Sequence, residues 1–595
     1  MIIMAENIQF ITKNYSTLFL LILVFWGFGK TFFKHFCSTT GDRWLDMAMV
    51  NTTGLGIFIF TLQILAVSGQ LLRSNLNILI LSGLILSVIQ AVPLWKHRRA
   101  HTPVSAIPVK NRRFWVGLAL IGVALLPTFI APLAPPKEWD ELMYHLPHAN
   151  QWAQTGKLSV NEWLRYPWFP YNFNLLYSAA LILRGDILTH LLHAFAGWMV
   201  TLIIYRLGIL YSNRITATIA TLMWLALSKS FFSNSYIELG IALFITTACV
   251  ACIFWFENPS NRGWLIITAF MLGLAAGSKY QALTFLPLFF AAFVLRDRRL
   301  RSITLACAFF LLPCIYWYVR NAWITGDPFN PLGAKLFGFY DWNSQDYAWQ
   351  LLDIKRVSNW PKSPLWPLLL LPFLKPWTQG RAFRSASIFS LYALLVWYFT
   401  SHYDRYLVPA MPVLALLSAW AITESVSRLE PLIENHITWC TLKRQRLGLI
   451  TMACMASLLI SVYSLKNANK LASFVAYTPE QRANFLRNNV VAYDLLVQLH
   501  EIPDLKIYQW GLEDAIYYAP NPIWGEVFGP WRYSNLNELS VPALATYLHE
   551  QGFNTLLIRD NVLAPLLQQS DFPHYFKNLG HGNGAQAYHI ISKNK

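Results

Sequence analysis

Two consecutive carboxylates follow a long apolar run in the first third of the chain. Residues 114–133 are apolar enough to cross a membrane, and the prolines at 135–136 end that helix. Asp140 and Glu141 come next. A carboxylate at the membrane surface can act as a general base toward a membrane-bound substrate. The alternative interpretation is that Asp140 caps the next helix, because Asp is a favoured N-cap residue.

Aromatic and histidine side chains follow the two acids. Glu141, His145 and His148 stand at positions i, i+4 and i+7, which lie on one face of an α-helix. Such a face could bind a divalent metal, or it could be the polar face of an interfacial helix, and the spacing leaves both open. The aromatic, proline-rich segment 165–174 then predicts a return into the membrane, as an interfacial belt or as a rim for a sugar or isoprenoid.

Further charged residues stand at the edges of apolar runs, where ionisable groups are costly and are therefore candidate functional residues. Glu238 and Arg405 begin such runs, whereas Lys279 and Arg320 end them. Alternation of the runs brings all four to the same face of the membrane as Asp140. Arg offers a lipid-linked phosphate a bidentate grip and Lys a point charge, and a carboxylate could deprotonate an acceptor. Each charge could instead be ion-paired, or reach along its stem to the interface.

The composition indicates which elements carry these residues. Of the 595 residues, 55% are hydrophobic and 13% are charged, about half the charged fraction of a soluble domain. A soluble globular protein and a disordered protein are therefore excluded. We expect about 14 membrane-spanning helices, and the short, proline-rich one at 364–376 could be re-entrant or interfacial instead. The expected spans are 16–33, 47–67, 76–95, 114–133, 187–206, 215–232, 237–256, 264–279, 281–295, 302–322, 364–376, 385–400, 405–423 and 447–465.

The positive charge predicts the orientation of the chain. The net charge is +17, and loops rich in Lys and Arg stay on the cytoplasmic side of a membrane. The basic segments are residues 96–113, 296–301 and 424–446. If the membrane is a bacterial cytoplasmic (inner) membrane, the periplasmic segments are residues 134–186, 323–363 and 466–595, and the candidate residues named above face the periplasm. Because the outer segments are close to neutral, the charge does not indicate a nucleic-acid partner.

Four regions are expected along the chain. Residues 1–113 hold N-terminal membrane helices and a basic cytoplasmic loop, 114–425 the catalytic core, and 426–465 a cytoplasmic loop and the last membrane helix. Residues 466–595 are typical of a small periplasmic α/β domain. Its expected helices are 479–500 and 540–551, and its expected strands are 506–510, 523–528 and 555–558. No cysteine lies in the outer segments, so no disulfide framework is expected there.

Four segments resemble the integral-membrane glycosyltransferases of the GT-C fold, which use polyprenyl-phosphate sugars. The resemblance covers residues 114–425 and is to the bacterial branch that includes aminoarabinose lipid A transferase and relatives of protein O-mannosyltransferases. Asp327 stands where the family usually has Asn, and Glu238 where many relatives have Asp. The matching segments are 139–141 with 144–147, 277–279, 320–321 with 325–331, and 405–412.

The resemblance implies a hexosyl or pentosyl transfer to a lipid, glycan or protein acceptor by one displacement that inverts the anomeric carbon. Asp140 would be the catalytic base, helped by Glu141 or Glu238. The cations Lys279, Arg320 and Arg405 would hold the departing polyprenyl phosphate, where charge builds in the transition state. Further substrate-binding residues would be Tyr144, His145, Asn321, His402 and Tyr406. No cofactor is expected, apart from the divalent metal left open above.

Two other functions stay open. A transporter or flippase of lipid-linked sugars would share the outer cations, but it predicts inverted repeats and charges at the midplane of the membrane. The sequence shows no such repeat. A polymerase or ligase of surface polysaccharide would rely on Arg and His in a large outer loop, and His402 is its candidate residue.

Overall fold

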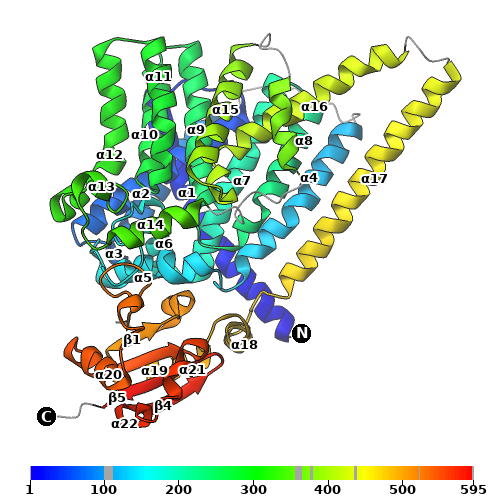
Figure 1. The fold of residues 1–595 in the computed structure, drawn as a ribbon. Helices are drawn as coiled ribbons and strands as arrows, with labels where there is room; N and C mark the ends of the chain where they lie inside the picture. The colour runs from blue at the N-terminus through cyan, green and yellow to red at the C-terminus, as the bar shows by residue number, and fades with distance from the viewer. Residues whose placement is uncertain are drawn as a thin grey trace.

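The computed structural model describes residues 2–98, 112–355, 365–374, 380–434, 439–520 and 523–591. A large bundle of helices runs as far as α17 (Trp439–Ala472), and a small α/β domain follows at one end of the bundle (Figure 1). We refer to residues 479–591 as the tail domain. The expected fold class, a helical polytopic protein with a small C-terminal α/β domain, is confirmed.

The bundle is built from apolar helices whose lengths suit a bilayer. An α-helix rises about 1.5 Å per residue, so about 20 apolar residues cross the hydrocarbon core. Among the described residues, nine helices meet this requirement by length and composition. They are α1 (Ile2–Phe36), α2 (Arg43–Val67), α3 (Arg73–Arg98), α4 (Arg112–Ile130), α7 (Asp186–Tyr211), α8 (Arg214–Ser228) extended by η3 (Lys229–Ser233), α9 (Glu238–Glu257), α12 (Leu300–Thr325) and α15 (Arg381–Thr400).

Shorter helices complete the bundle and its loops. Three are apolar: α6 (Asn172–Leu183), α10 (Arg262–Ala276), and η4 (Tyr280–Phe285) continued by α11 (Leu286–Arg296). The outer loops carry the 3-10 turn η1 (Ala131–Leu133), the π-turn η2 (Glu141–His145), α5 (Leu146–Thr155), α13 (Ala334–Phe337) and α14 (Ser344–Ile354).

The expected spans coincide with helices except at two places. Part of the expected span 364–376 is a 3-10 segment, η6 (Trp366–Leu374), which is too short to cross a bilayer because its prolines prevent a longer α-helix. The expected span 405–423 begins too early, because a separate 3-10 turn, η7 (Asp404–Leu407), precedes α16 (Met411–Glu434). The total of about 14 spans stays a prediction.

The centre of the bundle is formed by α7 and α9. In their most apolar windows, 83% of the α7 residues and 72% of the α9 residues are buried, against 28% for α12 and 22% for α15. The outer helices thus leave apolar side chains uncovered, as expected for surfaces that face lipid. The polar ends of α7 and α9 are consequently fixed by packing on all sides, and the candidate site is built around them.

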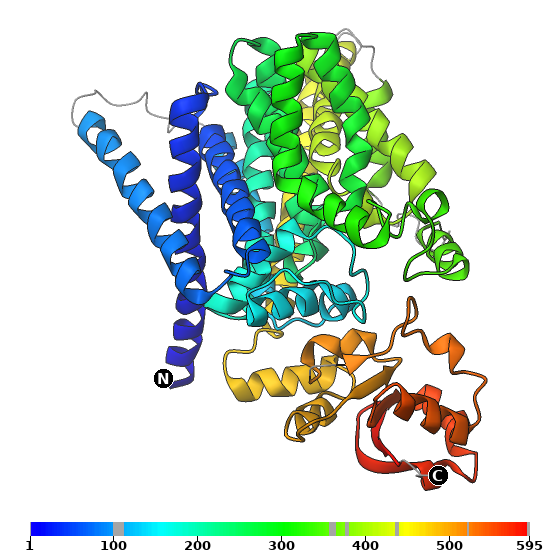
Figure 2. The same cartoon turned by 90° about the vertical axis from the view of Figure 1, so that its left-hand side faces the viewer.

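The described parts of the basic segments lie at one end of the bundle and the outer loops at the other, as the charge pattern predicts. The basic segment 296–301, where α11 ends and α12 begins, contains four arginines and lies at the end far from the tail domain, and α3 ends and α4 begins at that same end (Figures 1 and 2). The outer loops lie at the opposite end and contact the tail domain. Arg482 of the tail binds Asp186, and Arg532 binds Asp346, both at 2.5 Å.

The tail domain is a five-stranded sheet covered by short helices. The strand order is β2-β1-β3-β5-β4, with β2, β1 and β3 parallel and with β5 antiparallel to both β3 and β4. The strands are β1 (Ile507–Trp510), β2 (Ile523–Trp524), β3 (Thr555–Arg559), β4 (Phe576–Gly582) and β5 (Ala585–Ile590). The helices are α18 (Pro479–Asn489), α19 (Tyr493–His500), α20 (Val541–Glu550), α21 (Asp560–Leu567) and α22 (Phe572–Tyr575), with 3-10 turns η8 (Glu513–Tyr518) and η9 (Tyr533–Asn535).

The expectation of one helix over 479–500 is wrong, because the segment breaks into α18 and α19. Ala492 adopts a left-handed backbone (φ 55°), and its N–H donates to the Asn583 carbonyl at 2.8 Å. The pair at 490–491 is β-branched valine, which favours helices weakly. The hairpin of β4 and β5 was not predicted, although the Asn583-Gly584 turn between its strands is a strong hairpin signal.

Candidate functional site

The Asp140 turn is a short π-helical segment at the start of the first outer loop. Asp140 immediately precedes η2, and its side chain makes no capping hydrogen bond, so the interpretation of Asp140 as a helix cap is wrong. Its Oδ2 accepts a hydrogen bond from the Tyr144 hydroxyl at 3.1 Å and another from the Arg405 guanidinium. Asp140 is only 8% exposed. The carboxylate is therefore held by one phenol and one cation.

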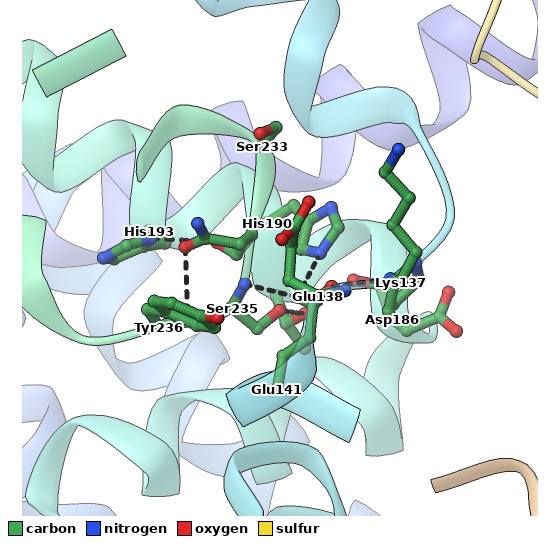
Figure 3. Close-up of polar contacts among 12 residues, drawn as sticks. Lys137, Glu138, Glu141, Asp186, His190, His193, Ser233, Ser235 and Tyr236 are labelled. Carbon is green, nitrogen blue, oxygen red and sulfur yellow. Dashed lines mark hydrogen bonds and ion pairs between the residues drawn. The ribbon is translucent and has the colours of Figure 1, made fainter. Parts of the chain in front are cut away.

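The neighbouring carboxylate, Glu141, has different partners and forms a clamp with α7 and the segment before α9 (Figure 3). Its Oε1 accepts from the backbone N–H groups of Lys137 and Glu138, both at 2.7 Å. Its Oε2 accepts from the Ser235 N–H at 2.7 Å and lies 2.9 Å from His190 Nε2. The side chains of Glu141 and His190 are both fully buried. Four contacts occupy this carboxylate and fix the turn that carries Asp140.

A second ion pair lies next to the first. Glu238, which opens α9, is 2% exposed and binds Lys279 Nζ at 2.8 Å. The Tyr406 ring joins this pair to Arg405, because Lys279 Nζ lies 4.7 Å and the Arg405 guanidinium carbon 5.5 Å from the ring centre. Two carboxylates and two cations from four separate segments therefore converge on one tyrosine.

Arg320 lies near the C-terminal end of α12 and is held differently. Its Nε and one Nη donate to Asn321 Oδ1 at 3.0 and 2.8 Å, and its guanidinium lies over the rings of Trp317 and Trp168 at 5.0 and 5.7 Å. Asn321 donates in turn to the Tyr280 hydroxyl at 2.8 Å. Within the described residues, Arg320 forms no ion pair with a carboxylate. It is a cation held in place by an amide and two rings.

The two histidines of the expected metal face point to different partners. The Nδ1 atom of His145 lies 3.0 Å from Asn174 Nδ2, whereas the Nε2 atom of His148 lies 3.1 Å from the Arg165 carbonyl oxygen. The π-turn changes the register, so Glu141, His145 and His148 do not share a face. No group of three or more His, Cys, Asp or Glu side chains in the described ranges could hold a metal ion. The structure thus offers no support for the metal interpretation.

His402 lies at the turn between α15 and η7. Its Nε2 is 3.2 Å from the Tyr398 carbonyl oxygen, and its ring is near the rings of Trp397 and Tyr398. None of its contacts with other described residues reaches the Asp140 group. Arg405, three residues later, does reach it, because η7 turns the chain back toward the Asp140 turn before α16 begins.

The electrostatics of the Asp140 turn favour an anionic Asp140 and a neutral His145. Burial raises the pKa of Asp140, but the Arg405 charge and hydrogen bond more than offset it, so the pKa lies below its usual range. Burial alone lowers the pKa of Arg405, and the Asp140 charge outweighs it and keeps Arg405 cationic. Burial lowers the pKa of His145 to about 3. His145 is therefore an uncharged hydrogen-bonding group near neutral pH.

Several contributors to the site were missed by the sequence analysis. The Tyr236 ring lies 6.0 Å from the Arg405 guanidinium carbon, and its hydroxyl oxygen accepts from the Asp140 N–H at 3.4 Å. His190 is the buried partner of Glu141. Both stand within or beside apolar runs, and the residues around them in the sequence do not distinguish them from other tyrosines and histidines. Only their position at the outer ends of α7 and α9 could have indicated them.

Sequence comparisons find relatives of short stretches. The family model described as SF2091/S2213 matches residues 481–589, which lie in the tail domain. The uncharacterized Shigella flexneri protein SF2092/S2214 is 29% identical over 145 residues, covering 22% of this chain and 79% of that protein. A second Shigella flexneri protein, SF2093/S2215, is 40% identical over 60 residues, covering 10% of this chain and 30% of that protein. None of these descriptions names an activity.

Solved structures match most of the chain. ArnT from Cupriavidus metallidurans bound to undecaprenyl phosphate superimposes with a TM-score of 0.53 at 14% identity, over 80% of this chain and 98% of that one. The apo state of ArnT gives a TM-score of 0.52 over the same shares. This chain therefore has the GT-C fold.

Proposed function

We propose that the protein is a membrane glycosyltransferase that moves a sugar from a polyprenyl-phosphate donor to a lipid, glycan or protein acceptor. The observation that carries the proposal is the convergence of Asp140, Glu238, Lys279 and Arg405 at one end of a GT-C bundle. The fold match includes a protein bound to undecaprenyl phosphate, a ligand of the proposed donor's lipid class. The charge pattern supports a site on the periplasmic face of a bacterial inner membrane.

The cations suit a phosphate that gains charge during the reaction. Arg405 has a buried Nε atom without a hydrogen-bond partner, and Arg320 has no carboxylate partner among the described residues. Both can therefore accept an anionic ligand without first losing every existing contact. When the bond between the anomeric carbon and the phosphate oxygen breaks, the electron pair stays on the phosphate. Fixed guanidinium and ammonium groups stabilise that charge most in the transition state.

Asp140 is the proposed base. The acceptor oxygen attacks the anomeric carbon, its proton passes to the Asp140 carboxylate, and polyprenyl phosphate leaves from the opposite face. A carboxylate with a lowered pKa takes this proton late, after the attacking oxygen has become acidic. A donor phosphate that binds Arg405 also draws that cation away from Asp140, which raises the basicity of Asp140 while donor is bound. Donor binding and base activation are thereby linked through one arginine.

The other candidate residues receive supporting roles in this proposal. Glu238 holds Lys279, and Tyr144 orients the Asp140 carboxylate through its hydroxyl. Glu141 is assigned to the clamp, because its two oxygens already take part in four contacts. His145, Asn321 and Tyr406 remain candidates for substrate contact, and His402 has the weakest support.

The test is transfer of labelled sugar from a polyprenyl-phosphate donor by the full-length protein in liposomes, comparing wild type with Asp140→Asn. We expect cleavage of the donor and a labelled acceptor with wild type, and neither with the variant. Normal turnover by a folded Asp140→Asn protein would contradict the assignment of the base. Movement of intact donor across the bilayer, without cleavage, would instead establish a transporter.

A further inference from the structure

The tail domain contacts the Asp140 turn on both sides. The Tyr518 hydroxyl of η8 donates to the Pro136 carbonyl at 2.8 Å, just before the turn. Leu142, within the turn, is 1% exposed and belongs to the buried cluster that contains Leu496 and Ile516 of the tail domain. The backbone on either side of Asp140 is therefore packed against a domain more than three hundred residues later in the chain.

A buried ion pair makes a third contact with the first outer loop. Arg165 Nε donates to Glu526 Oε1 at 2.7 Å, and an Nη of the same guanidinium also contacts this oxygen. Glu513 Oε1 lies 3.9 Å from that Nη, so two tail-domain carboxylates face one arginine. The side chains are 11% exposed for Arg165 and 5% for each acid. A pair this deeply buried fixes its partners, because removing one leaves an uncompensated charge.

Tyr166, the next residue, has an unusual backbone that depends on this anchorage. Its φ is 58°, in the left-handed region that residues other than glycine rarely adopt. The Tyr171 hydroxyl donates to its carbonyl at 2.9 Å. Its ring meets the Tyr144 ring edge-on, with centres 5.1 Å apart. The backbone at Tyr166 therefore decides where a ring stands against the tyrosine that binds Asp140.

We propose that Arg165 and Glu526 are positioning residues for the Asp140 carboxylate, acting through Tyr166 and Tyr144. The ion pair fixes the backbone of Tyr166, the Tyr166 ring supports Tyr144, and the Tyr144 hydroxyl donates to Asp140 at 3.1 Å. The tail domain is then part of the catalytic apparatus. This inference rests on the proposed transferase function and deepens it.

The first test compares Glu526→Ala with Asp494→Ala in the full-length protein. Asp494 also pairs with an arginine of the tail domain, Arg487, but those side chains are 53% and 49% exposed. For Glu526→Ala we expect kcat to fall about tenfold with the donor KM within about twofold, because the phosphate-binding cations are unchanged. Asp494→Ala should leave both constants unchanged. A rise in donor KM with unchanged kcat would overturn the proposal.

A double-variant cycle separates this route from a general loss of structure. If Glu526 acts through Tyr144, the double variant Glu526→Ala with Tyr144→Phe loses no more kcat than the worse single variant. If the kcat of the double variant falls by the product of the two single losses, the two residues act independently and the proposal is overturned. Should Glu526→Ala fail to fold, Arg165→Lys takes its place, since it retains a buried cation but loses the forked contact.

The two levels of proposal fail in distinguishable ways. Wild type that transfers sugar, alongside a Glu526→Ala protein with wild-type kcat, would contradict the positioning role alone. Wild type that never cleaves a polyprenyl-phosphate donor would contradict the transferase function and the positioning role with it.

Discussion

Asp140 and Glu141 are adjacent in the chain, yet their surroundings differ in kind. Glu141 is fully buried and takes part in four contacts, three of them with backbone N–H groups. Asp140 is held by two side chains, one of which, Arg405, is 24% exposed at its side chain. Backbone donors cannot move without unfolding the turn, whereas side-chain donors can be exchanged for a ligand.

The difference supports the proposal that Asp140 takes part in the chemistry while Glu141 stabilises the fold. A carboxylate bound by fixed backbone donors has no free position for a proton from a substrate. A carboxylate bound by an arginine that also faces a phosphate can change partners during a reaction. The division follows from the partners that the fold brings to each acid: Arg405 of η7 for Asp140, and His190 of α7 for Glu141.

The largest expected effect comes from removing the Asp140 charge. Asp140→Asn should lower kcat by about 10²–10⁴-fold, the usual contribution of a positioned general base, while the thermal unfolding midpoint stays close to that of wild type. Steady-state transfer assays and thermal unfolding in detergent measure the two quantities. Glu138→Gln, two residues before Asp140, is the matched control and should retain activity. Comparable losses of kcat in Asp140→Asn and Glu138→Gln would contradict a specific role of Asp140 as the base.

Glu141→Gln should show the opposite pattern. Its amide group would face backbone donors, and a broken buried ion pair typically costs about 3–5 kcal/mol of folding stability. We expect a clearly lower thermal unfolding midpoint, with substantial activity in the fraction that remains folded. Asp494→Asn is the control, because Asp494 forms an exposed pair with Arg487 that contributes little. An unchanged midpoint with lost kcat would make Glu141 a catalytic candidate again.

Arg405→Met should separate the proposed binding of the donor phosphate by Arg405 from its pairing with Asp140. Loss of a charged hydrogen-bonding group should reduce kcat/KM by about 10–100-fold. The remaining activity should also become more sensitive to acid. Asp140 accepts a proton only when it is ionised, and its lowered pKa keeps it ionised below the usual aspartate pKa of about 3.9. Without Arg405, burial is no longer offset and raises the pKa of Asp140. A pH profile of kcat/KM should therefore show its acid limb at higher pH, and an unmoved limb would contradict the pairing.

Tyr144→Phe should give the smallest effect. It removes one neutral hydrogen bond to Asp140 and leaves the ring that packs on Tyr166. A hydrogen bond of this kind contributes about 0.5–1.5 kcal/mol, so we expect kcat to fall about twofold to tenfold. Steady-state assays at fixed donor concentration detect this. A loss as large as that of Asp140→Asn would mean that Tyr144 itself transfers the proton.

The sequence predicted the apolar helices well and the small elements less well. Length and hydrophobicity are local properties, so the spans were found wherever an α-helix is long enough to cross a bilayer. The start of the span at 405–423 was placed too early, because the 3-10 turn η7 depends on the packing around it. At 364–376 the prolines are a local signal, and they had left a re-entrant or interfacial segment open. In the tail domain, the break at Ala492 depends on a hydrogen bond to Asn583, far along the chain.

By itself the sequence determined the class of protein, its basic and neutral ends, and the residue types available for phosphate binding and proton transfer. It named Asp140, Glu238, Lys279 and Arg405 because ionisable groups at the edges of apolar runs are rare. Tertiary structure decided the pairing: Asp140 with Arg405, Glu238 with Lys279, and Glu141 with His190. These partners lie far apart in sequence, and no local pattern encodes which acid meets which base.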